Sequence, residues 1–220
     1  MKRRSKVLAT VLCAVLLVVA SVMGTLAYLT DSEKMENTFT VGKVYIDLTE
    51  APVDAEGKAT DGERVTASKT EVLGNAYHLV PGRKIDKDPT VTVKADSEEA
   101  YVRMKVTVTF ADKLPEEMVD YDLSSVFDYN ADWERVGYTM ASDGKSIEYI
   151  YNYKDTVAKD SAKDTELPAL FRTITVPTDF TNEQLAVFGG MTIAIDAYAI
   201  QAETFADAAA AWTAFDAQNS

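Results

Sequence analysis

The sequence predicts a mainly β protein: a two-sheet antiparallel sandwich of jelly-roll type with two or three short helices, one of them at the C-terminus. Apolar residues recur at every second position through much of the chain, which is the period of a strand with one buried face. The predicted strands are short, separated by turn signals and spread over a single domain-sized stretch. Their irregular spacing disfavours a large barrel.

The clearest strand is 101–110, where apolar and polar residues alternate without a break. Residues 89–94 form a predicted strand before it, and a turn at 95–100 makes the two a hairpin. A second hairpin is predicted around Asp143 and Gly144, a pair suited to the positive φ angles of a tight turn. Its strands are 133–140 and 146–153, and other strands are predicted at 39–48, 76–80, 170–176 and 191–200.

Two helices are predicted with caps or a clear apolar face. The first spans 181–188, starts with Thr181 and Gln184 at capping-box spacing, and stops at two glycines. The second is C-terminal, and one of its faces carries Phe205, Ala208, Trp212 and Phe215. We expect this face to cover an end or a face of the sandwich, and a partner-binding stripe is the alternative. A third, weaker helix is predicted at 114–127.

The N-terminus has the pattern of an export signal. Its start is basic, with Lys2, Arg3, Arg4 and Lys6, and residues 7–30 carry no charge. Thr25 and Ala27 place small residues three and one before a cut that would leave Tyr28 first. The prediction is a signal peptide at 1–27 and one secreted domain at 28–220, with an N-terminal arm at 28–38. The alternative is an uncleaved anchor, because 24 uncharged residues are long enough to span a bilayer.

The composition narrows the function classes. Residues 1–27 hold four of the 22 basic side chains and none of the 35 acidic ones, so a cleaved chain would carry 18 basic against 35 acidic groups, a formal charge of −17. Such a surface disfavours nucleic acid and repels anionic lipid. The single cysteine, Cys13, lies in the signal, so the cleaved chain has no disulfide. These features predict a protein at the cell surface or in the extracellular matrix.

No catalytic or metal constellation stands out, and we predict that the chain is not an enzyme. His78 is the only histidine, and a zinc site normally needs two or three nitrogen or sulfur ligands, whereas the cleaved chain offers no second histidine and no cysteine. Cys-His catalysis lacks its cysteine, and Ser-His-Asp catalysis is a remote option. Calcium is the one cofactor left open, with weak candidate ligands at Asp86, Asp88 and Asp96, although these loops lack a calcium-loop pattern and a solvated acidic loop is the simpler interpretation.

Three tyrosines, 149, 151 and 153, share one face of a predicted strand. A platform for stacking carbohydrate is one interpretation of this row, and a packed sheet face is the more common one.

Several segments resemble the TasA/camelysin family of secreted proteins, which depend on the signal peptidase SipW. The most specific is the signal-to-strand junction, Gly-Thr-Leu-Ala-Tyr-Leu-Thr-Asp at 24–31 followed by Asn-Thr-Phe-Thr-Val-Gly at 37–42. Internal segments at 81–89, 99–103 and 195–203 strengthen the resemblance. Residues 112–164 match nothing in the pattern.

The resemblance implies a jelly-roll domain of a Gram-positive bacterium, processed by a dedicated signal peptidase, that forms biofilm matrix fibres with itself or with related matrix subunits. In such fibres an N-terminal strand of one subunit completes the sheet of the next. By position, 39–48 would be this donor strand or the first strand of the domain, and the candidate assembly residues are Phe39, Val41, Val44, Ile46 and Leu48.

Two other functions remain as alternatives. One is an exported monomeric binding module for carbohydrate or a matrix protein, using the tyrosine face or long loops. The other, a secreted metallohydrolase, rests only on the metallopeptidase label of camelysin, and one histidine without a His-Glu-x-x-His motif does not support it.

Overall fold

The computed structural model describes residues 44–66, 80–114 and 126–219. The chain divides into two units, Met1–Val41 and Gly42–Ser220, and everything described below belongs to the second. Within the described ranges, none of the helices has the length and apolar character that crossing a bilayer requires.

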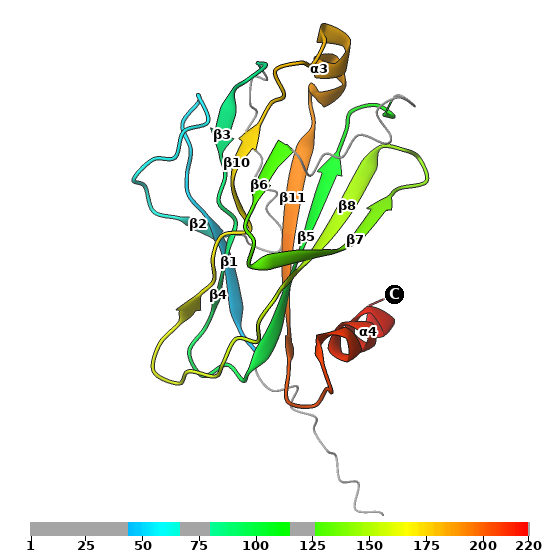
Figure 1. Ribbon diagram of the computed structural model, residues 1–220. Helices are drawn as coiled ribbons and strands as arrows, with labels where there is room; N and C mark the ends of the chain where they lie inside the picture. The colour runs from blue at the N-terminus through cyan, green and yellow to red at the C-terminus, as the bar shows by residue number, and fades with distance from the viewer. Residues whose placement is uncertain (1–43, 67–79, 115–125, 220) are drawn as a thin grey trace, which may run out of the picture. The chain divides into compact units, whose positions relative to one another are not determined.

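One layer of the fold is a four-stranded antiparallel sheet (Figure 1). Its strand order is β11 (Thr192–Gln201), β5 (Ala100–Thr109), β8 (Ser146–Tyr153) and β7 (Trp133–Met140). β7 and β8 form a hairpin whose turn contains Gly144 at φ 69°. β11 and β5 are far apart in the sequence and pair over ten residues without a register shift.

The second layer is built from two smaller antiparallel sheets. Their orders are β2 (Val65–Thr66), β1 (Ile46–Glu50), β4 (Thr90–Val93), β9 (Thr165–Glu166), and β3 (Lys84–Asp86), β10 (Phe171–Thr175), β6 (Phe127–Tyr129). Backbone bonds continue across the gap between them, from Lys87 N–H to Arg172 C=O at 3.0 Å and from Leu170 N–H to Pro89 C=O at 3.0 Å. The two sheets therefore act as one bent layer.

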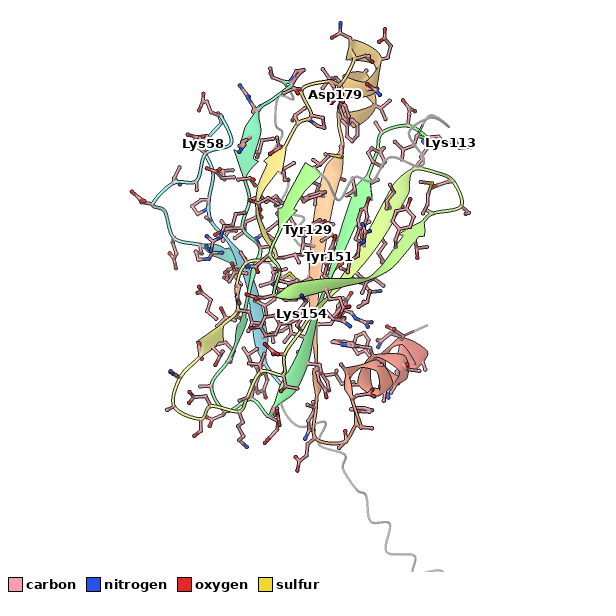
Figure 2. The ribbon with its side chains drawn as sticks, in the orientation of Figure 1. Lys58, Lys113, Tyr129, Tyr151, Lys154 and Asp179 are labelled. Carbon is pink, nitrogen blue, oxygen red and sulfur yellow. The ribbon has the colours of Figure 1, made fainter. Side chains whose placement is uncertain are left out.

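Side chains from both layers fill the space between them. The stacked rings of Tyr129 on β6 and Tyr151 on β8, with centroids 4.3 Å apart, join the layers across the core (Figure 2). Burial raises the pKa of Tyr129, as expected for a phenol taken out of water. The alternating residues of the central strands are almost fully buried: Val91, Val102, Met104, Val106, Val108, Ile147, Tyr149 and Phe171.

Two helices complete the described part. α3 (Asn182–Phe188) has the predicted capping box, in which the Thr181 side chain accepts from Gln184 N–H and the Gln184 side chain accepts from Thr181 N–H. Phe188 anchors α3 by packing on Phe110 and Phe180. α4 (Ala208–Gln218) starts at Asp207, whose side chain accepts from Ala210 N–H.

The predicted fold class is confirmed as a mainly β antiparallel sandwich. The predicted hairpin of 89–94 with 101–110 is wrong: β4 pairs with β1 and β9, whereas β5 pairs with β11 and β8. The turn at 95–99 therefore crosses from one layer to the other. Most of the predicted helix at 114–127 and of the predicted strand at 76–80 lies outside the described residues, and Phe127 belongs to β6.

Candidate assembly edge

β11 forms one edge of its sheet. On one side it pairs with β5 along its whole length, and no described strand pairs with its other side. It is long, has no bulge and no proline, and carries one charged side chain, Asp196. An edge of this kind is a template for an added strand.

The register shows which backbone groups face outward. In an antiparallel ladder, every second residue bonds to the partner strand and the others point away. Ala202 N–H bonds to Glu99 C=O at 2.8 Å, which fixes the even-numbered residues of β11 as those bonded to β5. The N–H and C=O groups of the odd-numbered residues of β11 therefore point away from β5, among them Ile193, Ile195, Ala197 and Ala199.

The side chains of these four residues face the core but are only partly buried. Ile46 and Leu48, on β1 in the other layer, are also partly buried against the same core, and β1 lies against β11. The β5 residues that pair with the four β11 residues, in contrast, are at most 1% exposed. The side of the sandwich between β1 and β11 is therefore incompletely closed, and a further strand there would bury apolar surface as well as form hydrogen bonds.

The other edges of the described sheets are less suited to strand addition. β7 has a register shift between Arg135 and Gly137, and Glu134 and Arg135 on it are exposed. Bulges and edge charges are common devices against edge pairing. β2 and β9 have two residues each and β6 has three. β11 is therefore the one long, regular edge in the part of the chain that the structure describes.

The first described residues of the chain lie near the C-terminal end of β11. Tyr45 N–H donates to Ser97 Oγ at 3.1 Å, and Tyr45 C=O accepts from Lys94 N–H at 2.9 Å. Glu99, two residues after Ser97, bonds to Ala202 just beyond β11. The first described residues of the chain and the end of β11 therefore lie at the same end of the sandwich.

Some of the residues predicted for processing and assembly lie within the described part of the chain, and others lie outside it. Ile46 and Leu48 lie in β1 and pair with the domain's own β4, so this part of 39–48 is the first described strand. Val44 precedes β1 and is half-buried. Thr25, Ala27, Tyr28, Phe39 and Val41 lie outside the described residues.

The three candidate calcium ligands do not converge on one site. Asp86 accepts from Ala59 N–H and lies 3.6 Å from Lys58 Nζ. Asp88 accepts from Arg64 at 2.7 Å and from Ala51 N–H at 2.7 Å. Asp96 sits in a turn at φ 65°. Asp86 and Asp88 thus hold the loop after β1, and no group of three or more metal-ligand side chains occurs among the described residues.

The tyrosine row of β8 belongs to the core. Tyr149 and Tyr151 are 0% and 3% exposed, and Tyr153 packs edge-on against Trp133. Two of the three rings are therefore out of reach of a carbohydrate in solvent. His78 lies outside the described residues.

Sequence reasoning missed the role of Arg103, because alternation alone places it on a solvent-facing side. Its side chain is buried on the outer face of β5, where its guanidinium lies 4.1 Å from the centre of the Trp212 ring of α4. It also donates to Asn152 at 2.8 Å and to both carboxylate oxygens of Asp216 at 3.1 Å. The expectation that the C-terminal helix covers a face of the sandwich is confirmed by this docking.

Searches of protein families, of curated proteins and of solved structures find no match to this chain.

Proposed function

We propose that this chain is an exported structural protein of a Gram-positive extracellular matrix, and that it assembles into fibres by strand addition. The N-terminal arm of one subunit would add to the free edge of β11 in the next. The observation that carries the proposal is this edge, which is ten residues long, regular and half-open on its core side. The export pattern at 1–27 and the resemblance to matrix-fibre proteins support it.

The alternation at the end of the arm and just beyond it, at residues 38–41, suits this edge. Residues that face each other in an antiparallel pair place their side chains on the same face of the sheet. Phe39 and Val41, two residues apart, can therefore both lie opposite members of the row from Ile193 to Ala199. In that position the N–H and C=O groups of Phe39 and Val41 would bond to the outward backbone groups of β11, and their side chains would fill the open side of the core. Thr38 and Thr40 would then face outward.

The direction of the chain favours addition to another subunit. Because the first described residues lie at the end where β11 finishes, an N-terminal segment folded back along its own β11 would run parallel to it. Every described strand pair is antiparallel, and parallel pairing is slightly less stable per residue. An arm from a second subunit is free to take the antiparallel direction.

We also propose that the sandwich is of jelly-roll type. Both layers pair strands that are distant in the sequence, β11 with β5 and β4 with β9, as two interlocked Greek keys require. In such a fold only the edge strands have a side at which a further strand can pair.

Two matched variants of the chain beginning at Tyr28 test the assembly. The donor-defective chain carries Phe39→Asp and Val41→Asp. The acceptor-defective chain carries Ala197→Pro, which removes an outward N–H that β5 does not use. Ala194→Pro is its control, because Ala194 N–H bonds to β5, so we expect this variant to lose stability in the monomer itself.

The unchanged chain should form sedimentable fibres, and each defective chain alone should remain a folded monomer in analytical ultracentrifugation. An equimolar mixture of the two should form a heterodimer and nothing larger, because one supplies the arm and the other the edge. Fibres from either defective chain would contradict strand addition at this edge. An unchanged chain that stays monomeric, with a mixture that also stays monomeric, would favour the monomeric binding module.

A further inference from the structure

Helix α4 docks on the outer face of the same edge. Arg103 holds the helix through Asp216 and Trp212, and Trp212 is 2% exposed. Arg103 is itself bonded to Asn152 on β8, so the attachment point lies inside the sheet and not at its margin. α4 is therefore fixed to the two inner strands, β5 and β8.

From this fixed position α4 also lies against β11, and one aromatic pair belongs to this contact. The ring of Phe215 meets the ring of Tyr198 edge-on, with centroids 5.3 Å apart. Phe215 also packs against Trp212 at 5.5 Å, so it is held by the docked part of the helix. Burial raises the pKa of Tyr198, and the carboxylates of Asp196 and Glu148 raise it further.

Tyr198 lies next to the outward-pointing backbone groups of β11. It lies between Ala197 and Ala199, two of the residues whose backbone groups point outward. Among the described strands, only β5 pairs with β11, and the core-facing side chains of β11 are partly exposed. The outer-face contact at Tyr198 therefore adds support to β11 beside its pairing with β5.

We propose that α4 positions the β11 edge for strand addition, with Phe215 acting through Tyr198. The role in strand addition rests on the proposed function. Phe215 is a positioning residue in this scheme, since it touches the accepting strand and not the incoming one. An edge that is already held in place loses less conformational freedom when a strand adds, so binding is tighter.

The test uses three substitutions in the donor-defective chain, which keeps the protein monomeric. Phe215→Ala removes the contact with Tyr198 and leaves the Arg103–Asp216 pair. Phe215→Leu keeps apolar bulk against the tyrosine. Phe180→Ala is the control, because it removes a ring stacked on Phe188 of α3, which precedes the start of β11 and does not involve Tyr198.

Two measurements separate positioning from general stability. The first is hydrogen exchange of the Asp196, Tyr198 and Ile200 amides, which bond to β5. The second is the affinity of each chain for a synthetic peptide of residues 36–43. We expect Phe215→Ala to speed exchange at these amides and to weaken peptide binding about tenfold, as the loss of one or two kcal/mol of preorganisation implies. Phe215→Leu should restore most of both, and Phe180→Ala should change neither beyond its effect on global unfolding.

Equal exchange at these amides in Phe215→Ala and Phe180→Ala would overturn the positioning role. Exchange that differs as expected, with no peptide binding by the parent chain, would leave α4 as a support of β11 but would count against strand addition itself. Peptide binding that Phe215→Ala does not weaken would retain the proposed function and refute the link to α4.

Discussion

The ammonium group of Lys87 lies 2.6 Å from Glu50 Oε2 and 2.7 Å from Glu50 Oε1, and both side chains are largely buried. Glu50 ends β1, and Lys87 lies between β3 and β4. This pair, together with Arg64, which bonds to Thr49 and Asp88, ties β1 to its own layer. β1 is therefore a fixed strand of the domain, and the donor must precede it.

Breaking the buried pair should destabilise the monomer strongly. Lys87→Met or Glu50→Leu alone leaves a buried charged group without its partner, and we expect a loss of about 3 kcal/mol in the free energy of unfolding. Changing both, to Met and Leu, should lose less than the sum of the two single changes. Urea denaturation of the donor-defective chain measures this. Lys58→Met, at the exposed pair with Asp86, should cost less than about 1 kcal/mol, and an equal cost at both pairs would contradict this account.

The turn of the β7–β8 hairpin should be sensitive to a side chain at Gly144. Its φ of 69° is unfavourable for alanine by roughly 1 kcal/mol. An added Cβ would also lie 2.9 Å from Cγ of Lys113, a flexible side chain that can move aside. We expect Gly144→Ala to cost about 1 kcal/mol and Gly144→Asn less, because asparagine tolerates positive φ. Thermal unfolding that ranks alanine as the better residue would refute the assignment of strain.

Asp164 should titrate below its ordinary value. Lys94 Nζ, 2.5 Å from Asp164 Oδ2, and the Ala95 N–H donated to Asp164 Oδ1 both hold its pKa below 3.8. A carboxyl whose folded pKa is lowered stabilises the fold above its unfolded pKa, and this stabilisation disappears as the pH falls through the lowered value. Carboxyl NMR should show this shift, and Lys94→Met should move the pKa of Asp164 back toward 3.8. An unchanged value in that variant would exclude Lys94 as the main cause.

Assembly should be faster in salt. The cleaved chain would carry a formal charge of −17, so its copies repel each other over a distance that shrinks from about 30 Å at 0.01 M to about 10 Å at 0.1 M salt. We expect fibre growth, followed by light scattering, to rise several-fold over this range. Sodium and calcium chloride at equal ionic strength should act alike if screening is the cause. A response to calcium alone would instead indicate specific binding.

Alternation identified most strands, and a local turn signal predicted one pairing correctly, the β7–β8 hairpin around Asp143 and Gly144. The pattern at 101–110 places Val102 and Val106 in the core correctly, because period two is a local property. The other pairings are decided by contacts distant in sequence, and the short gap between Val93 and Tyr101 suggested a hairpin that the layers do not form.

The candidate site divides in the same way. The arm could be predicted from sequence because a signal, a small-residue cut and apolar alternation are local patterns, and it stays a prediction. The β11 edge could not be predicted, since its position depends on which described strands lack a neighbour. Arg103 was missed for a related reason: the helix that buries it lies more than a hundred residues away in the sequence.

One regular edge and one arm in each subunit have a geometric consequence. A contact between two different surfaces of the same molecule repeats head to tail, so it builds a line with a direction and not a closed pair. The two ends of such a line differ: one presents an empty β11 and the other an unused arm. The bulge in β7 removes the second long edge at which the line could branch. A small amount of donor-defective chain should then stop growth at one end only.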